Sequence, residues 1–397
     1  MTTPSDPIVI TGAARTPMGG FQGCLSGASA PELGANAIKA AIQRAGVAPE
    51  DVDEVFMGCV LPAGLGQAPA RQAALGGGLT LATGCTTVNK MCGSGMKAAM
   101  LAHDLLRAGT GEIIVAGGME SMTNAPYLMD KARSGYRMGH GKIFDHMFLD
   151  GLEDAYDTGR LMGTFAEDCA EKYQFTRESQ DAFAIESLTR AKKAIDDGTF
   201  GHEVVPVVIA GRREEITVNQ DEQPGKANLE KIPTLKPVFR EGGTVTPANS
   251  SSISDGAAAL VLMSEEQAAI RGIKPLARVI AHTTHAQAPA LFTTAPVGAM
   301  KKLFELTGWK PEDVDLFEVN EAFAVVTMAA MRELGLPREK VNVHGGACAL
   351  GHPIGASGAR ILVTLLAALN KYDLKRGVAS LCIGGGEATA MAVERVS

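Results

Sequence analysis

Short apolar segments alternate with amphipathic helical patterns through both ends of the chain. Runs rich in valine, isoleucine and alanine predict strands, and apolar residues that recur every three to four positions predict helices. The strands are expected near 8–11, 55–58, 86–88, 113–116, 255–263, 277–281, 316–319, 341–343, 379–383 and 390–393. The helices are clearest at 30–45, 93–107, 322–334 and 355–370. This alternation predicts a layered α/β fold.

The same motifs occur twice in the same order. GVAPEDVD returns as GWKPEDVD, GSGMK has a counterpart in GASGAR, and IIVAGG has one in ASLCIG. The paired positions are 46–53 and 308–315, 93–97 and 355–360, and 113–118 and 379–384. A near-constant offset between the copies predicts two similar halves.

The halves define the expected domains. We assign 1–121 together with 251–275 to the first half, and 276–397 to the second. Residues 122–250 have no counterpart and form an inserted lobe that carries several lysines and arginines. An insertion of this length is expected to contain structure of its own and to cover a site, although a decorative surface lobe fits the same facts.

Composition excludes some functions. The formal net charge of −7 gives no general attraction to nucleic acid or an anionic membrane. Seven cysteines without regular spacing argue against a disulfide framework and for a reducing compartment. The N-terminal segment 1–7 has no presequence pattern, and the apolar stretch 361–369 is too short to cross a bilayer. A cytoplasmic protein is therefore expected.

Cys92 is the first candidate for chemistry. Most isolated cysteines are small packing residues. Cys92, however, directly precedes Gly93-Ser94-Gly95 and the helix predicted from 93. The amides and positive dipole at a helix start favour a thiolate and an oxyanion. We therefore expect Cys92 to be a nucleophile.

A histidine, a second thiol and an asparagine are further candidates. His352 lies in a Gly/Pro turn before a helix, where a base is well placed. Cys382 ends a strand and enters Gly384-Gly385-Gly386, which suits a thiol that transfers protons. Asn320 follows the strand 316–319 and either caps a helix or holds a water or carbonyl oxygen.

No metal site is expected. His344, Cys348 and His352 have four-residue spacing, but the intervening glycines and Pro353 oppose a continuous helix that would align them. His103 lies within a predicted helix and has no evident partner.

With these motifs in place, the chain resembles the thiolase family over nearly its full length, most closely the biosynthetic acetoacetyl-CoA thiolases. Four motifs carry the resemblance: NKMCGSGMKAA around Cys92, NEAFA at 320–324, GGACALGHPIGASGAR at 345–360 and CIGGGEATA at 382–390. The resemblance implies two similar α/β halves in a five-layered α-β-α-β-α core with an inserted loop domain.

The resemblance also implies a role for each matching residue. Cys92 matches the acylated nucleophile, His352 its base, and Cys382 the residue that moves a proton at the acetyl methyl carbon. Asn320 matches the holder of a water in one oxyanion hole, and the amides of Cys92 and Gly384 form the other. The matching coenzyme A positions are Ser251, Ala322 and Phe323, with Met162 also assigned to that site.

The implied activity is acetyl-CoA C-acetyltransferase, a ping-pong condensation of two acetyl-CoA to acetoacetyl-CoA and CoA. It needs coenzyme A thioesters as substrates and no permanently bound cofactor, and the family implies a homotetramer and a place in fatty acid metabolism. A degradative 3-ketoacyl-CoA thiolase is the nearest alternative. A decarboxylating ketoacyl synthase would lack Cys382, and a non-catalytic lipid-binding relative would be expected to lose Cys92 or His352.

Overall fold

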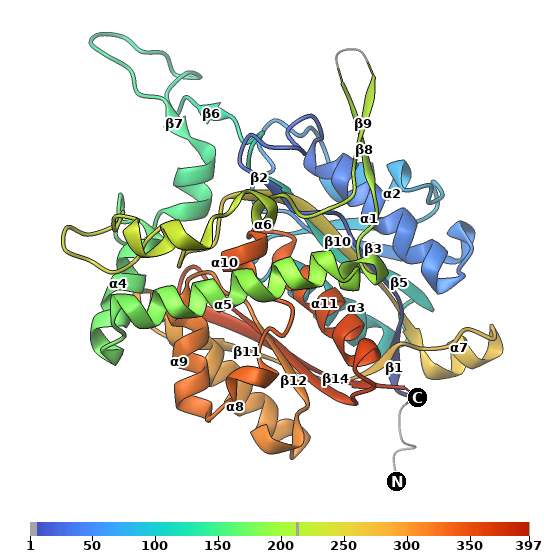
Figure 1. Ribbon diagram of the computed structural model, residues 1–397. Coiled ribbons are helices and arrows are strands. Elements are labelled where there is room, and N and C mark those ends of the chain that lie inside the picture. The colour runs from blue at the N-terminus through green and yellow to red at the C-terminus, as the bar shows by residue number, and fades with distance from the viewer. Residues whose placement is uncertain (1–5, 212–213, 397) are drawn as a thin grey trace.

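The computed structural model describes residues 6–211 and 214–396 (Figure 1). Most of the N-terminal segment considered above falls on residues 1–5, which lie outside the described residues, as do Arg212, Arg213 and Ser397. In the part of the chain that is described, no helix has the length and apolar character needed to cross a membrane.

The helices and strands follow the repeated pattern of the sequence. The first half contains β1 (Ile8–Arg15), β2 (Gly19–Gly20), α1 (Ala30–Ala45), β3 (Glu54–Gly58), α2 (Pro69–Gly76), β4 (Gly84–Val88), α3 (Ser94–Arg107), β5 (Ile113–Ser121), β10 (Ser254–Ser264) and α7 (Glu265–Ile270). The second contains β11 (Ala277–Ala286), α8 (Ala295–Thr307), β12 (Leu316–Val319), α9 (Ala324–Leu334), α10 (Ala347–Leu350), α11 (Ser357–Lys371), β13 (Arg376–Ile383) and β14 (Glu387–Arg395).

These strands form a ten-stranded sheet in the order β12-β13-β14-β11-β1-β10-β5-β3-β4, with β2 paired to β10. The two halves of the sheet meet where β1 pairs with β11 through Val9 and Ile10. β3 is parallel to β4 and β5 in the first half, and β12 is parallel to β13 in the second. Each half therefore places the ends of parallel strands on one side, where α/β folds bind ligands.

Helices divide the structure into five layers. α1 and α2 cover the outer face of the first half-sheet, and α8, with α9 packed on it, covers the outer face of the second. α3 and α11 pack on each other and contact both half-sheets, so they form the central layer. The five-layered α-β-α-β-α core predicted for this chain is confirmed.

Local sequence explains why the outer and central helices differ. α1 begins with a capping box between Ser29 and Glu32, ends at Gly46 with φ of 68°, and buries only one face. α11 is apolar or buried around most of its circumference, because packed elements surround it in the central layer. A one-sided pattern thus marks the outer layer, and an all-round apolar pattern marks the central layer.

One predicted strand is wrong. Residues 341–343 form a single bridge between Val341 and Phe317, and Asn342 adopts a left-handed φ of 48° that ends the pairing. The Asn342 side chain replaces the missing backbone partner of Val319. It accepts from the Val319 N–H and donates to the Val319 carbonyl, both at 2.8 Å. A side-chain amide therefore continues the pairing of β12 where backbone pairing stops.

The residues between β5 and β10 carry structure of their own. They contain β6 (Tyr127–Leu128), β7 (Phe144–Asp145), α4 (Met162–Tyr173), α5 (Arg177–Asp196), β8 (Val207–Ala210), β9 (Glu215–Val218) and α6 (Glu222–Lys226). The segment around β6 and β7 projects from the body as an arm, and β8 and β9 form a separate hairpin (Figure 1). The expectation that this insertion is structured is confirmed.

Candidate active site

Cys92 lies in a tight turn between β4 and α3. Met91 adopts a left-handed conformation with φ of 47°. Ser94 Oγ holds the turn, accepting from the Lys90 N–H at 2.8 Å and donating to the Met91 carbonyl at 2.6 Å. Such backbone strain in a non-glycine residue is costly and clusters at functional sites. The turn places Cys92 immediately before the start of α3, as predicted.

The Cys92 sulfur faces the turn that follows Cys382. The backbone N–H groups of Gly384 and of Cys92 itself lie close enough to that sulfur to lower its pKa. The two turns also touch beside it, since a Cβ added at Gly93 would lie 2.3 Å from Ile383 Cδ1. Two backbone donors at one position can stabilise an oxyanion formed there.

Burial decides the resting state of Cys92. It raises the pKa of Cys92 to about 11, although the amides of Gly384 and Cys92 oppose this shift. The amides lower the pKa in the direction expected from the start of α3, but loss of solvent outweighs them and the pKa rises. Cys92 rests as a thiol and needs a base when it attacks.

His352 has the arrangement of such a base. Ser357 Oγ donates to the Pro353 carbonyl at 2.9 Å, so it accepts from His352 Nδ1–H at 2.5 Å. This assigns the free lone pair to Nε2, which is buried and has no hydrogen-bond partner among the described residues. Burial, aided by Arg360, lowers the pKa of His352 to about 3. The imidazole is therefore neutral near pH 7 and ready to accept a proton.

Asn320 lies at the end of β12 beside β13. Val319 is paired with Ser380, and the Asn320 N–H donates to the Ser380 carbonyl at 3.0 Å. The Asn320 residue is 1% exposed, yet its Oδ1 and Nδ2 find no partner within 6–211 and 214–396. Buried amides are nearly always hydrogen-bonded. This side chain is therefore free to bind a water or a substrate oxygen.

Asn320 does not cap a helix. α9 starts at Ala324, and its N-cap residue is Phe323, which gives no side-chain cap. The alternative of a structural N-cap is wrong, because three residues separate the asparagine from the helix.

Cys382 ends β13 in an apolar environment. The residue is 1% exposed and packs in one cluster with Met162, Ala322 and Phe323. Burial, followed by the nearby Cys92, raises the pKa of the Cys382 thiol well above its ordinary value. A thiolate formed here would be a strong base, which suits removal of a proton from carbon.

A short backbone segment connects the turns of Asn320 and His352. Ser251 N–H donates to the Ala322 carbonyl at 2.9 Å, and His352 N–H donates to the Ser252 carbonyl at 3.1 Å. The segment thus holds two turns from separate elements in fixed relation.

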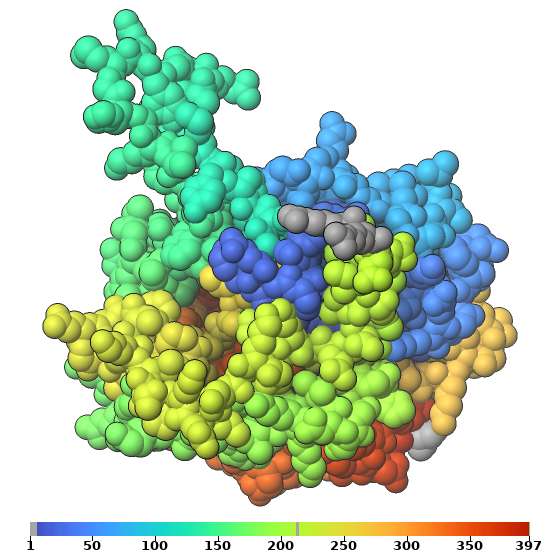
Figure 2. All heavy atoms as spheres, turned by 45° about the horizontal axis from the view of Figure 1, so that its top comes forward, coloured from blue at the N-terminus to red at the C-terminus, as the bar shows by residue number. Residues whose placement is uncertain are grey.

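The Cys92 turn lies beside the His352 turn, because Cys92 and Met91 pack in one apolar cluster with Ile354, two residues after His352. Figure 2 shows a hollow beside the yellow residues of the insertion, with red residues of the C-terminal half at its floor. Cys92 thus lies beside the turn of Cys382 and Gly384, and backbone contacts join the turns of Asn320 and His352 to the same region.

The residues assigned to coenzyme A surround Cys382. A Cβ added at Gly384 would lie 3.8 Å from Met162 Sδ, so Met162 lies beside the turn that holds the Cys92 sulfur. Ala322 and Phe323 pack in the Cys382 cluster, and Ser251 is joined to Ala322 by backbone. These positions are compatible with a pantetheine arm, and their contacts with coenzyme A stay a prediction.

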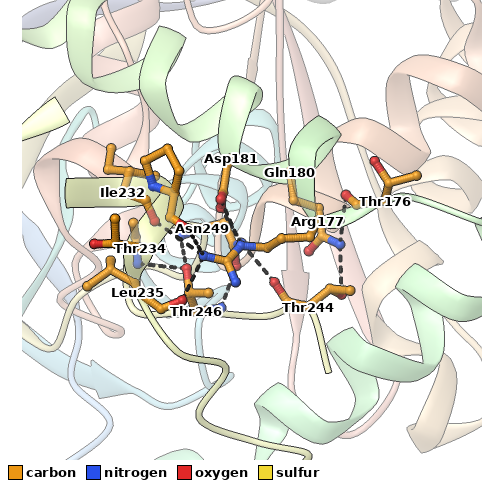
Figure 3. A network of polar contacts seen from close by, with 12 residues as sticks. Thr176, Arg177, Gln180, Asp181, Ile232, Thr234, Leu235, Thr244, Thr246 and Asn249 are labelled. Carbon is orange, nitrogen blue, oxygen red and sulfur yellow. Dashed lines mark hydrogen bonds and ion pairs between the residues drawn. The ribbon is translucent and has the colours of Figure 1, made fainter. Parts of the chain in front are cut away.

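A polar network in the inserted segment supports this region (Figure 3). Arg177 Nε donates to Asp181 Oδ2 at 2.7 Å, and Asn249 Nδ2 donates to Asp181 Oδ1 at 3.1 Å. Arg177 Nη2 also donates to the Leu235 carbonyl at 2.8 Å. The network fastens the chain before Ser251 to α5, so the insertion fixes one wall of the site.

Some polar residues of the site escape sequence reasoning. Ser357 orients His352, five positions further along the chain. Glu120 is fully buried, accepts from the N–H groups of Val60, Leu61 and Gly355, and has its pKa raised by burial to about 7. The only available signal for Glu120 is a carboxylate within an otherwise apolar strand.

The residues considered as a metal face have other partners. His344 Nε2 lies 3.1 Å from Tyr372 Oη, while the Cys348 thiol donates to the Glu321 carbonyl at 3.7 Å. Glu321 also accepts from the Cys348 N–H at 3.1 Å. These contacts separate the three side chains into different local structures, as the intervening glycines indicate.

A partly exposed thiol, a neutral imidazole and two backbone donors define a cysteine-dependent acyl-transfer site. The sequence matches the family description "Thiolase, N-terminal domain" over residues 8–266 and "Thiolase, C-terminal domain" over 273–395. The chain belongs to the thiolase family.

Known relatives match almost the whole chain. Acetyl-CoA acetyltransferase 2 of Arabidopsis thaliana is 52% identical, covering 98% of this chain and 96% of the relative. Acetyl-CoA acetyltransferase of Escherichia coli (strain K12) is 51% identical, covering 98% and 99%. The crystal structure of the Bacillus anthracis acetyl-CoA acetyltransferase superposes with a TM-score of 0.96 at 42% identity, covering 99% of each chain. The predicted thiolase fold is confirmed.

Proposed function

We propose that this chain is an acetyl-CoA C-acetyltransferase, which condenses two acetyl-CoA molecules to acetoacetyl-CoA and CoA. The relatives that match its full length are acetyl-CoA acetyltransferases. The observation that carries the proposal is the close approach of Gly93 to Ile383, because it places the turn after Cys382 against the turn of the nucleophile. Coenzyme A thioesters are its substrates.

The first half-reaction transfers acetyl to Cys92. The Cys92 sulfur attacks the thioester carbonyl while its proton passes to Nε2 of His352. The Gly384 and Cys92 N–H groups stabilise the oxyanion. The C–S bond to coenzyme A breaks, the imidazolium returns its proton to the departing sulfur, and CoA leaves. Because His352 and Cys92 both rest neutral, proton transfer accompanies attack rather than preceding it.

The second half-reaction forms the carbon–carbon bond. Cys382 as a thiolate removes a methyl proton from the second acetyl-CoA, and the Asn320 side-chain amide, directly or through a water that it binds, stabilises the enolate oxygen. The carbanion attacks the acetyl carbon, the bond to Cys92 sulfur breaks, and the departing Cys92 thiolate takes the proton from Cys382, which returns Cys92 to the thiol and Cys382 to the thiolate. Acetylated Cys92 cannot ionise, so no thiolate at position 92 opposes ionisation of Cys382 at this step. The Cys382 thiolate is thus easier to form at the step that needs it.

Two substitutions test the assignment. Cys92→Ala should abolish incorporation of radiolabelled acetyl from acetyl-CoA into protein. Cys382→Ala should retain that labelling and lose condensation. Cys24→Ala removes a thiol outside the site and should retain both activities. Unchanged condensation in Cys382→Ala would refute the proton-transfer role.

Chain-length preference is tested by thiolysis of 3-ketoacyl-CoA substrates. We expect acetoacetyl-CoA to be cleaved faster than 3-ketohexadecanoyl-CoA. The reverse order would indicate a degradative thiolase.

We also propose that the chain forms a homotetramer. β4 is an edge strand of the sheet, Leu81 just before it is 79% exposed, and the projecting arm exposes Tyr127 and Met138. Exposed edges and apolar surfaces favour association. Light scattering with size-exclusion chromatography measures the mass, and a monomer would contradict this proposal. The cytoplasmic location and the role in fatty acid metabolism stay predictions.

A further inference from the structure

A cluster of possible metal ligands lies away from the thiols, at the end of α3. His103 and Asp104 lie near the C-terminal end of α3, and His282 projects toward them from β11. His103 thus has two partners that sequence reasoning does not reveal. The side chains of His103 and His282 are each 14% exposed, and that of Asp104 is 54% exposed. The cluster is therefore partly desolvated and still open to an ion from solvent.

Three atoms of the cluster form a nearly equilateral triangle. His103 Nδ1 lies 3.1 Å from Asp104 Oδ1 and 3.1 Å from His282 Nε2, which is 2.9 Å from Asp104 Oδ1. Metal–nitrogen bonds of about 2.0–2.1 Å place neighbouring ligands about 3.0 Å apart in an octahedron and about 3.3 Å apart in a tetrahedron. One ion can therefore bind all three atoms with little movement of the side chains.

The chemistry of the cluster suits a transition metal. Imidazole and carboxylate ligands fit zinc, nickel and cobalt, and the ligating imidazoles must be neutral. Burial lowers the pKa of both His103 and His282, which favours this form. The negative end of α3 also favours a cation. The positive charges of Arg107, near His103, and Lys97, near His282, lower the pKa values of these histidines and disfavour a bound cation.

We propose that His103 Nδ1, Asp104 Oδ1 and His282 Nε2 bind one divalent transition-metal ion, with water in its remaining coordination positions. The ion joins the end of α3 to β11 and thus links the two halves of the chain. Cys92 precedes the opposite end of α3, so the site is separate from the catalytic thiols.

Cobalt(II) is the probe, because its spectrum identifies its ligands. The purified full chain is freed of metal with a chelator and titrated with Co²⁺, while visible d–d absorption and dialysis equilibrium are recorded. One Co²⁺ per chain is expected, without the charge-transfer band that a thiolate ligand produces. His282→Asn is expected to weaken this binding at least about tenfold. His202→Asn removes an exposed histidine elsewhere and is expected to change nothing.

Further measurements separate binding from folding. Circular dichroism and retained thiolysis activity show that His282→Asn is folded. If it is not folded, Asp104→Asn, at an exposed position, replaces it with the same expectation. Equal Co²⁺ affinity of the native chain and the folded variant overturns the proposal. So does the absence of saturable binding, or a thiolate charge-transfer band, which would place the metal on the cysteines.

Discussion

Cys92 and Cys382 are two thiols of one site with different surroundings. Cys92 is partly exposed and two backbone N–H groups near its sulfur lower its pKa, whereas Cys382 is 1% exposed and lies in an apolar cluster. Burial raises the pKa of both. Nearby backbone N–H groups and access for substrate suit Cys92, whose sulfur must carry an acyl group. Exclusion of water suits Cys382, whose sulfur must move a proton. Environment, rather than the side chain, assigns the two roles.

The difference follows from the elements that supply each thiol. Cys92 lies in a turn from a parallel strand into a central helix, and such a turn exposes its side chain to substrate. Cys382 is the penultimate residue of β13, which has strands on both sides, so its side chain packs within the layers. The glycine turn that follows Cys382 then provides the Gly384 amide to Cys92.

The largest expected effect separates the two half-reactions. Asn320→Ala should reduce condensation about 10²–10³-fold, because one oxyanion donor is lost, and should leave acetylation of Cys92 nearly unchanged. Rapid-quench measurement of acetyl-enzyme formation, together with the steady-state condensation rate, checks this. Asn370→Ala, at an exposed position of α11, is the matched control. Equal loss in both half-reactions would show that Asn320 supports the whole site.

The pH dependence of alkylation compares the thiols directly. Iodoacetamide reacts with thiolates, so its rate with Cys92 should rise about tenfold per pH unit through neutral and mildly alkaline pH, toward a pKa of about 11. Buried Cys382 should remain unlabelled over the same period. Peptide mass spectrometry quantifies both sites. A plateau near neutral pH would instead show that Cys92 rests as a thiolate.

The sequence predicts the layers and the catalytic residues well, because both depend on local pattern. α1 covers the predicted 30–45, and the glycine turns mark Cys92, His352 and Cys382. Prediction from the sequence fails where contacts between distant residues determine the local structure or the pKa. Asn342 ends a predicted strand by pairing its side chain with Val319, and desolvation reverses the expected pKa shift of Cys92. The sequence around Asn342 and Cys92 contains no pattern that would predict either result.

Side chains that meet across large separations are also invisible in the sequence. Glu120 receives the Gly355 N–H from the other half of the chain, and His103 meets His282 across 179 positions. Each residue alone fits an ordinary structural role. Only the packing of the two halves shows which of them converge.

Substitution of glycines in the turn after Cys382 should have a smaller effect than Asn320→Ala. Gly386 has φ of 88°, and an added Cβ would lie 2.4 Å from the Gln287 carbonyl oxygen. Gly386→Ala should therefore destabilise the protein by about 1–3 kcal/mol and misplace the Gly384 amide. Gly384 has space for a methyl group, so Gly384→Ala should alter stability by less than about 1 kcal/mol. Urea denaturation and acetylation rates measure both. Equal stability of the two variants would contradict this strain.

The smallest expected effect concerns an ion pair that joins the two thiol turns. Lys90 Nζ contacts Glu387 Oε2, and the side chains are 20% and 34% exposed. Partly exposed pairs contribute little, so the coupling energy between Lys90→Met and Glu387→Gln should be below about 1 kcal/mol. A double-mutant cycle on the condensation rate measures it, and each single variant should lose less than about fivefold. The packing of Gly93 against Ile383 keeps the turns together when the ion pair is absent. A coupling of several kcal/mol would mean that this charged pair, and not that contact, holds the nucleophile against the glycine turn.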